Sequence, residues 1–193
     1  IEDDIKLCYY PAGHIIGACQ IHLDLIEGSV HHRLNFTGDI GGPKNYLYVY
    51  KRSALPYANL TIAENTYNQP KRQNKFYDRQ KDLEKIEAAV QDYNKILFGT
   101  FSLNRCQVLL RILYGMWQYN RLDRNIKIYV DAPLAQKFCD IWPWENNFNP
   151  YEWENVHFVE SWEESQALQK SNEHFIIIST SNFLTGGRIV EWL

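Results

Sequence analysis

The sequence predicts an α/β protein in which a β-rich segment precedes a parallel sheet covered by helices on both faces. Short runs of β-branched and aromatic residues with alternating apolar positions fill residues 5–63, a pattern typical of strands. Beyond about residue 78, apolar strand runs alternate with segments of helical periodicity, which favours a parallel sheet buried on both faces. We place the boundary between the two parts near residues 65–78.

The first part contains four predicted strands, at residues 5–10, 19–26, 32–36 and 60–63. Glu27-Gly28-Ser29 predicts a hairpin turn between the second and third strands, because glycine adopts the backbone angles of a tight turn. Residues 71–79 are polar and basic and predict an exposed crossover to the second part.

The second part alternates strands and helices along the chain. Leu83, Ile86, Val90 and Tyr93 recur at helical spacing and predict a helix over residues 78–93. Further helices are expected at residues 103–117, from Pro133 onward, at 163–169 and from 187 onward. Strands are expected at residues 95–98, 126–130, 156–159 and 175–178.

Composition and charge narrow the class of protein. The chain is 45% hydrophobic and 22% charged, as in soluble globular proteins, and no apolar run is long enough to span a membrane. The net charge of −3 gives no general attraction for nucleic acid, so phosphate binding has to come from local groups or a metal ion. The four cysteines include no Cys-x-x-Cys pair, which favours buried reduced thiols in a cytoplasmic protein.

The strand ends of the second part carry candidate binding residues. In a doubly wound sheet, ligands bind beyond the carboxyl ends of the strands, where helix N-termini point. Small hydroxyl residues and glycines follow these ends at 99–102, 131–133, 160–161, 179–182 and 185–188. These segments are candidate anion sites. Ordinary helix caps are the alternative, which the topology alone favours.

The first part carries a sharper pair of residues. His14 lies in a turn between glycines directly before a predicted strand, and Asp39 lies in a glycine-flanked loop that ends another. Imidazole and carboxylate are ligands that zinc accepts, and glycines let the backbone approach a metal closely. Taken singly, a surface histidine and an Asx-type turn explain the two residues equally well. The other histidines have no ligand spacing, and we assign them no role.

Six segments together resemble the motif series of the β-CASP metallo-β-lactamase nucleases, the group that includes ribonuclease J and the eukaryotic pre-mRNA 3′-end endonuclease. The segments are, in chain order, GHIIGA, FTGDIG, ENTYN, GTFSLNRCQVLL, DAPLA and SNFLTGGR. The resemblance implies an α/β fold with two domains. On this resemblance, residues 1–70 are expected to form a partial metallo-β-lactamase domain, which is the β-rich segment. Residues 71–193 are expected to form a parallel α/β β-CASP cap domain that is incomplete at its C-terminal end.

The resemblance also implies roles for single residues in the first part. His14 matches a zinc-ligand histidine, and Asp39 matches the aspartate that bridges two zinc ions. Glu64 matches an acidic residue that supports the site and would orient a ligand histidine through a hydrogen bond. Asp39 and Glu64 are thus the implied catalytic residues, and His14 and Asp39 the implied metal ligands.

In the cap, the resemblance makes Arg188 a candidate contact for the substrate phosphates, and Arg105 a weaker one. Ser179 and Ser181, in the strand-end loop before Arg188, are further candidates. For Arg105, pairing within the cap is an alternative of equal weight.

The sequence also departs from the family pattern. The first metal motif, His-x-His-x-Asp-His, and two later histidine motifs are expected outside these 193 residues. Asn65 and Asn68 stand where the family often has Ser and Gly, and Asn182-Phe183 replaces Gly-Met. The chain is therefore interpreted as a fragment, with unpaired sheet edges that predict a homodimer.

The implied function is zinc-dependent hydrolysis of phosphodiester bonds in single-stranded nucleic acid, with RNA favoured and two zinc ions expected in the whole protein. No membrane partner is expected. Two alternatives stay open. One is a different metallo-β-lactamase-fold hydrolase, against which the cap motifs count. The other is a catalytically inactive scaffold subunit, which the retained His14, Asp39 and Glu64 disfavour.

Overall fold

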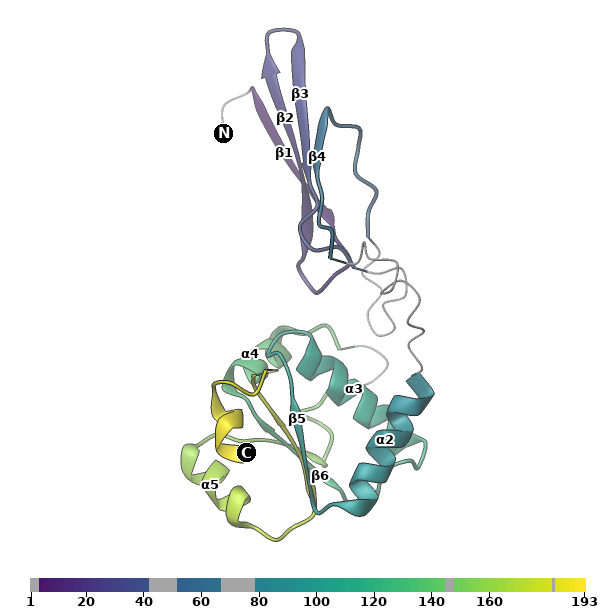
Figure 1. Cartoon of the computed structure of the whole chain (residues 1–193), viewed down its shortest axis with the longest axis vertical. Helices are drawn as coiled ribbons and strands as arrows, with labels where there is room; N and C mark the ends of the chain where they lie inside the picture. The colour runs from purple at the N-terminus through teal and green to yellow at the C-terminus, as the bar shows by residue number, and fades with distance from the viewer. Residues whose placement is uncertain (1–3, 42–51, 67–78, 145–147, 182) are drawn as a thin grey trace. The chain divides into compact units, whose positions relative to one another are not determined.

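A computed structural model describes residues 4–41, 52–66, 79–144, 148–181 and 183–193. The chain divides into two compact units, residues 1–76 and 77–193, which Figure 1 shows in purple to blue and in teal to yellow. The division falls inside the range where the sequence pattern changes. The predicted basic crossover lies outside the described residues, except for Arg79, which begins a helix.

The first unit is a sheet of four strands in the order β1-β2-β3-β4 (Figure 1). The strands are β1 (Ile5–Pro11), β2 (Cys19–Glu27), β3 (Val30–Phe36) and β4 (Leu60–Ile62). The first three pair antiparallel, and β4 joins β3 in parallel. Gly28, with φ 60°, and Ser29 form the predicted turn, in which Glu27 pairs with Val30. All four predicted strands are present.

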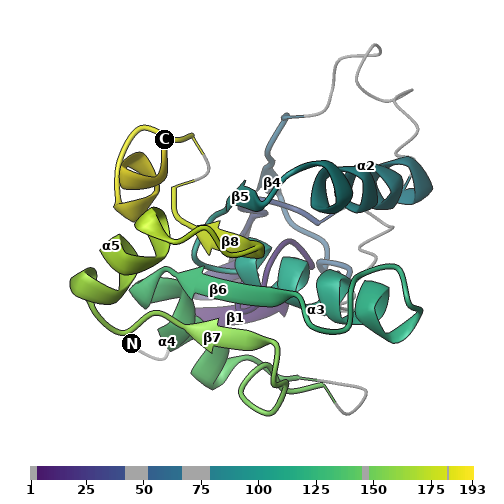
Figure 2. The ribbon, with the colours of Figure 1, turned by 90° about the horizontal axis from the view of Figure 1, so that it is seen from below.

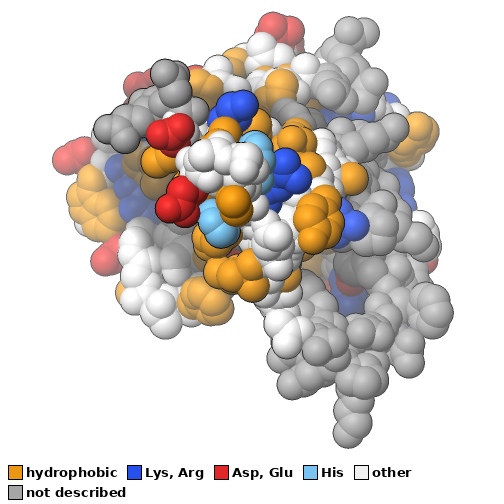
Figure 3. Space-filling model, turned by 90° about the horizontal axis from the view of Figure 1, so that it is seen from above, with side chains coloured by type: hydrophobic (Ala, Val, Ile, Leu, Met, Phe, Trp, Pro, Cys, Tyr) orange, Lys and Arg blue, Asp and Glu red, His pale blue; other side chains and the backbone are white. Residues whose placement is uncertain are grey.

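The surface of the first unit combines exposed apolar side chains with charged ones. Ile5, Leu7 and Tyr9 alternate along the edge strand β1 and are 39%, 37% and 65% exposed. Toward the β2–β3 turn, His31 Nδ1 lies 2.9 Å from the carboxylate of Asp24. Figure 3 shows histidine side chains beside acidic and basic ones, amid exposed hydrophobic side chains. His31 therefore has a carboxylate partner, which agrees with leaving it out of the metal ligands.

The second unit contains a sheet in the order β5-β8-β6-β7, in which every neighbouring pair is parallel. The strands are β5 (Lys95–Gly99), β6 (Lys127–Asp131), β7 (Val156–Phe158) and β8 (Phe175–Ser179). This sheet confirms the predicted parallel α/β architecture.

Helices cover both faces of this sheet (Figure 2). They are α2 (Arg79–Asp92), α3 (Arg105–Gln118), α4 (Pro133–Ile141), α5 (Trp162–Lys170) and the 3₁₀ helix η1 (Arg188–Trp192). Ile176 and Ile178 of β8 belong to the core cluster with residues of α2, α3 and α4. Phe175 instead contacts Trp192 of η1, with ring centroids 6.2 Å apart. Because successive side chains point to opposite faces, β8 is buried throughout.

Two details differ from the sequence predictions. The last predicted helix is a short 3₁₀ helix, because its N–H groups bond three residues back, from Val190 to the Gly187 carbonyl. The prediction of buried cysteines holds for Cys106 and Cys139 but is wrong for Cys8 and Cys19, which are exposed on β1 and at the start of β2. None of the described helices is both long and apolar enough to form a membrane-spanning segment.

Candidate functional site

Two glycine-rich loops of the first unit, residues 12–18 after β1 and residues 37–41 after β3, lie against each other. The Ala12 N–H donates to the Ala18 carbonyl at 2.9 Å and closes the first loop. The Gly41 N–H donates to the Ala12 carbonyl at 3.0 Å and joins the second loop to it. A Cβ atom on Gly41 would lie 1.6 Å from the carbonyl oxygen of Gly13. This approach therefore requires glycine at position 41.

The contact between the loops brings together the two predicted metal ligands. His14 Nε2 lies 3.9 Å from Asp39 Oδ2, and the two side chains are 41% and 75% exposed. Two donor atoms that bind the same tetrahedral zinc ion at about 2.0–2.2 Å lie about 3.4 Å apart. The observed separation is about 0.5 Å longer than this, and both side chains are accessible to an ion.

Glu64 lies just beyond β4 and holds the loop that carries Asp39. Its Oε1 accepts the Ile40 N–H at 2.7 Å, and its own N–H donates to Thr37 Oγ1 at 3.1 Å. Hydrogen bonds from the Thr66 side chain and the Ile40 N–H hold the pKa of the Glu64 carboxyl below its usual value. Glu64 is therefore an ionised residue that positions the Asp39 loop.

The described part of the chain contains no group of three or more His, Cys, Asp and Glu side chains that could hold a metal ion. A hydrolytic zinc ion normally has three protein ligands. His14 and Asp39 supply two suitable donors, so a complete centre needs further ligands.

The second unit holds a buried carboxylate at the carboxyl end of β6. Asp131 is fully buried, and its Oδ2 accepts from the Ser165 hydroxyl at 2.6 Å and from Trp192 Nε1 at 2.9 Å. Its Oδ1 pairs with the guanidinium of Arg188. The Ser179 hydroxyl donates to the main-chain carbonyl of Asp131 at 2.9 Å. These contacts join β6, β8, α5 and η1 into one network, which the sequence patterns did not predict.

Two predicted substrate contacts belong to this network. The Ser179 side chain is fully buried and its hydroxyl has a partner within the fold, so it offers no surface to a substrate. The Arg188 side chain is 23% exposed, and its charge faces the carboxylate of Asp131. Both side chains therefore have partners within the fold, and the partly exposed Arg188 stays a predicted substrate contact.

The other two predicted contacts remain accessible. Ser181 is partly buried and lies two residues after the end of β8, and Arg105 is exposed at the first position of α3. No hydrogen bond or ion pair joins the Arg105 side chain to another described residue, so pairing within the cap is not observed there.

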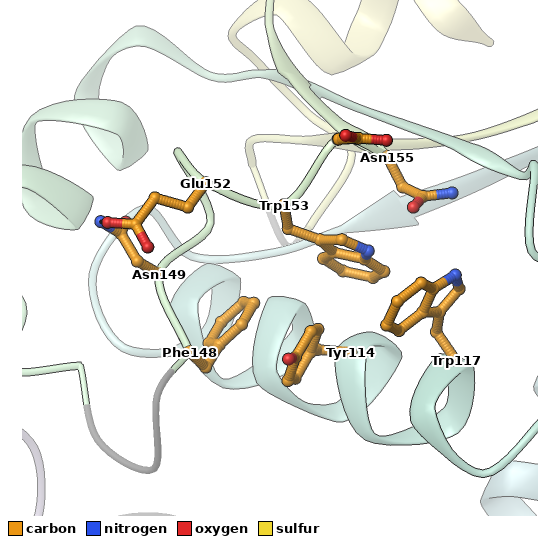
Figure 4. A pocket seen from close by; sticks show the side chains of 8 residues that line it. Tyr114, Trp117, Phe148, Asn149, Glu152, Trp153 and Asn155 are labelled. Atoms are coloured by element: carbon orange, nitrogen blue, oxygen red, sulfur yellow. The ribbon is translucent and has the colours of Figure 1, made fainter.

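Described residues of the second unit line several pockets, one of them about 340 Å³ beside α2. A pocket of about 200 Å³ opens at the carboxyl ends of β5 and β8, and its walls are Thr100, Phe101, Ser102, Thr180, Ser181, Gly186 and Gly187. A larger hollow of about 420 Å³ has aromatic walls that include Tyr114 and Trp153 (Figure 4). These two rings lie 5.2 Å apart, and Trp153 is only 6% exposed. The larger hollow is therefore the outer wall of the aromatic core, and the smaller pocket is where ligands of parallel sheets bind.

Comparison with known proteins agrees with this architecture. Residues 106–193 match the Beta-Casp domain family. The match covers most of the parallel α/β unit, which therefore contains a β-CASP domain.

Some relatives of the chain carry the names of nucleases, and others, such as a protein of Methanothermobacter thermautotrophicus, are named transcription termination factor FttA. An RNase J-like protein of Methanocaldococcus jannaschii is 27% identical over 100% of this chain and 46% of its own length. A ribonuclease of Thermus thermophilus is 28% identical over 98% of this chain and 45% of its own length. An endoribonuclease of Schizosaccharomyces pombe is 29% identical over 70% of this chain and 17% of its own length. The chain therefore spans less than half the length of each of these relatives.

Proposed function

We propose that this chain is part of a metal-dependent hydrolase that cleaves phosphodiester bonds in single-stranded RNA. The observation that carries the proposal is the accessible His14–Asp39 pair, 3.9 Å apart on two interlocked glycine loops. A surface histidine and an ordinary Asx turn require no such contact between loops that are distant in sequence. The β-CASP domain and the nuclease names of the relatives support the same reaction.

Zinc is the metal that the donors favour, because imidazole nitrogen and carboxylate oxygen are both common zinc ligands. His14 would hold an ion through Nε2, and Asp39 has a second carboxylate oxygen with which to bind a second ion. Zinc ions supply Lewis acidity at the phosphoryl oxygens and lower the pKa of a bound water. Glu64 keeps the Asp39 loop in place through the Ile40 N–H at 2.7 Å.

The second unit would bind the substrate at the carboxyl ends of its strands. Ser181 and Arg105 are the accessible members of the predicted contact set, and we propose that they bind the RNA backbone. Asp131 would act at a distance, by holding the segments that form this edge. Since the net charge is −3, binding depends on these local donors and not on a basic surface.

The test uses the longest reading frame that contains this chain, with the variant Asp39→Asn. We expect the purified protein to cleave single-stranded RNA, and the variant to lose both turnover and bound metal. Glu27→Gln is the matched control, because Glu27 is a 90%-exposed carboxylate in the same unit. A variant that kept full metal content and normal turnover would show that Asp39 is not a ligand.

The same experiment separates the two alternatives. A scaffold subunit shows no hydrolysis even with bound zinc. A hydrolase of small esters or thioesters cleaves such a substrate while leaving RNA, single-stranded DNA and duplexes intact.

A further inference from the structure

We propose that Phe101 and Phe183 form a stacking platform for a nucleobase of the single-stranded substrate, an inference that rests on the proposed function. The two rings are 47% and 71% exposed. Their centroids lie 5.9 Å apart in an edge-to-face arrangement, with 79° between the ring planes. Phe101 follows β5 and Phe183 follows β8, and these strands are neighbours in the sheet. Both rings therefore stand at the edge where ligands of parallel α/β sheets bind.

The backbone that carries each ring is anchored. The Phe101 carbonyl accepts the Cys106 N–H at the start of α3, at 3.3 Å. On the other loop, the Leu184 N–H donates to the Ser181 carbonyl at 3.3 Å. Leu184 also packs over Gly99, where a Cβ atom would lie 2.9 Å from its Cδ2. An aromatic side chain on anchored backbone loses little conformational entropy when a flat ligand stacks on it.

The size of the pocket beside the rings limits which part of a nucleotide it can hold. Its volume is about 200 Å³, and Phe101 itself forms part of the wall. Sites for drug-sized molecules have roughly 300–1,000 Å³, so this pocket suits a smaller group such as a phosphate or a ribose. Ser102 and Ser181 provide hydroxyl groups there, and Gly186 and Gly187 expose their backbone. With the phosphate or sugar in the pocket, the base has to lie outside it, next to the exposed rings.

A nucleobase fits this surface better than a protein segment does. An apolar segment of a partner would require a continuous apolar surface, whereas hydroxyl and glycine residues adjoin the two rings. Bases stack on aromatic side chains whatever their sequence, because every base has a π face. The inference therefore predicts base-dependent binding with little sequence preference.

The experiment compares two fluorescent ligands, a single-stranded RNA of about eight nucleotides and an oligomer of equal length without bases. Their affinities are measured by anisotropy with the 193-residue chain and with Phe101→Ala, Phe183→Ala, Phe183→Trp and Tyr119→Ala. Tyr119 is the matched control, since it is an aromatic residue 80% exposed at the C-terminal end of α3, away from the pocket. Thermal unfolding of each variant reports on the fold.

We expect each Phe-to-Ala variant to weaken RNA binding by about 5- to 150-fold, the range for loss of one base–aromatic stack. Binding of the oligomer without bases should stay unchanged, Phe183→Trp should bind like the unaltered chain, and Tyr119→Ala should have no effect. Equal losses for both ligands, or no loss for either, would overturn the stacking platform. If the unaltered chain binds RNA and the Phe variants bind it equally well, only this inference fails. If the unaltered chain and the longer protein bind no RNA at all, the proposed function fails too.

Discussion

The two units each carry an aspartate just after or at the end of a strand, and the two aspartates have opposite surroundings. Asp39 in the first unit is 75% exposed and has His14 within 3.9 Å. Asp131 in the second unit is fully buried. Its carboxylate pairs with Arg188 and accepts hydrogen bonds from Ser165 and Trp192. The first carboxylate retains lone pairs for a metal ion, whereas the hydrogen-bonding capacity of the second is used within the fold.

This comparison shows that the residue type and its place after a strand do not decide the role of a carboxylate. A buried charge is stable only if it is paired and hydrogen-bonded, and Asp131 meets both conditions through groups of its own unit. The exposed Asp39 needs no such partners because water solvates it. The roles of the two aspartates therefore follow from their burial and partners.

The largest expected effect concerns the exposed carboxylate. In the longer protein, Asp39→Ala should lower turnover by at least about 100-fold, since loss of a residue that merely supports a metal ligand already costs 10- to 100-fold. Because the side chain is 75% exposed, the free energy of unfolding should change by no more than about 0.5 kcal/mol. Single-turnover kinetics and denaturant unfolding measure the two quantities. If the free energy of unfolding fell by as much as the activation free energy rose, Asp39 would be a structural residue like Asp131.

The buried carboxylate gives the opposite prediction. Arg188→Ala leaves the charge of Asp131 without its cation, and breaking one partner of a buried pair costs about 3–5 kcal/mol. We expect this loss in the free energy of unfolding of the second unit. Urea denaturation monitored by tryptophan fluorescence measures it. Arg105→Ala is the control, as that exposed arginine should contribute less than about 0.5 kcal/mol. Equal stability of both variants would contradict the assignment of Arg188 to the Asp131 network.

The same comparison explains what the sequence could predict. Strands and helices follow from local periodicity, so the four strands of each sheet were predicted. His14 and Asp39 lie in short glycine loops that the local pattern indicates, whereas Glu64 was singled out by the resemblance to the family motifs. The network around Asp131 joins residues that are distant in sequence, and Trp192 carried no local signal at all. Ser179 was a candidate binding residue because it lies at a strand end. Its burial depends on tertiary packing, which a strand-end pattern does not show.

A smaller effect is expected at Glu64. Its carboxylate accepts the Ile40 N–H, and its pKa lies below the ordinary value of 4.5. The ionised form therefore stabilises the loop above about pH 4.5, and this contribution is lost as the pH falls through the lower folded pKa. Over the same range of pH, we expect the Ile40 amide to lose its protection against hydrogen exchange. In Glu64→Ala, protection should already be low at neutral pH, and a protected Ile40 amide in that variant would refute the hydrogen-bond assignment.

Metal affinity should respond to Glu64 as well. In the longer protein, Glu64→Gln should weaken zinc binding by about 10- to 100-fold, the range for residues that orient metal ligands. Competition with a fluorescent chelator measures this, with Glu27→Gln as the exposed control. If the zinc affinity stayed unchanged, Glu64 would stabilise the loop without orienting a metal ligand.

The smallest expected effect is that of zinc on the 193-residue chain alone. Its described residues supply His14 and Asp39 but no group of three ligands, and metal affinity depends on several deprotonated ligands held together. At zinc concentrations up to the dissociation constant, binding stabilises a fold by no more than about 0.4 kcal/mol. We therefore expect almost no shift in thermal unfolding at micromolar zinc, little zinc after dialysis and no cleavage of RNA. Near two zinc ions per chain, or cleavage that a chelator abolishes and zinc restores, would show that the first unit holds a complete centre with ligands beyond this pair.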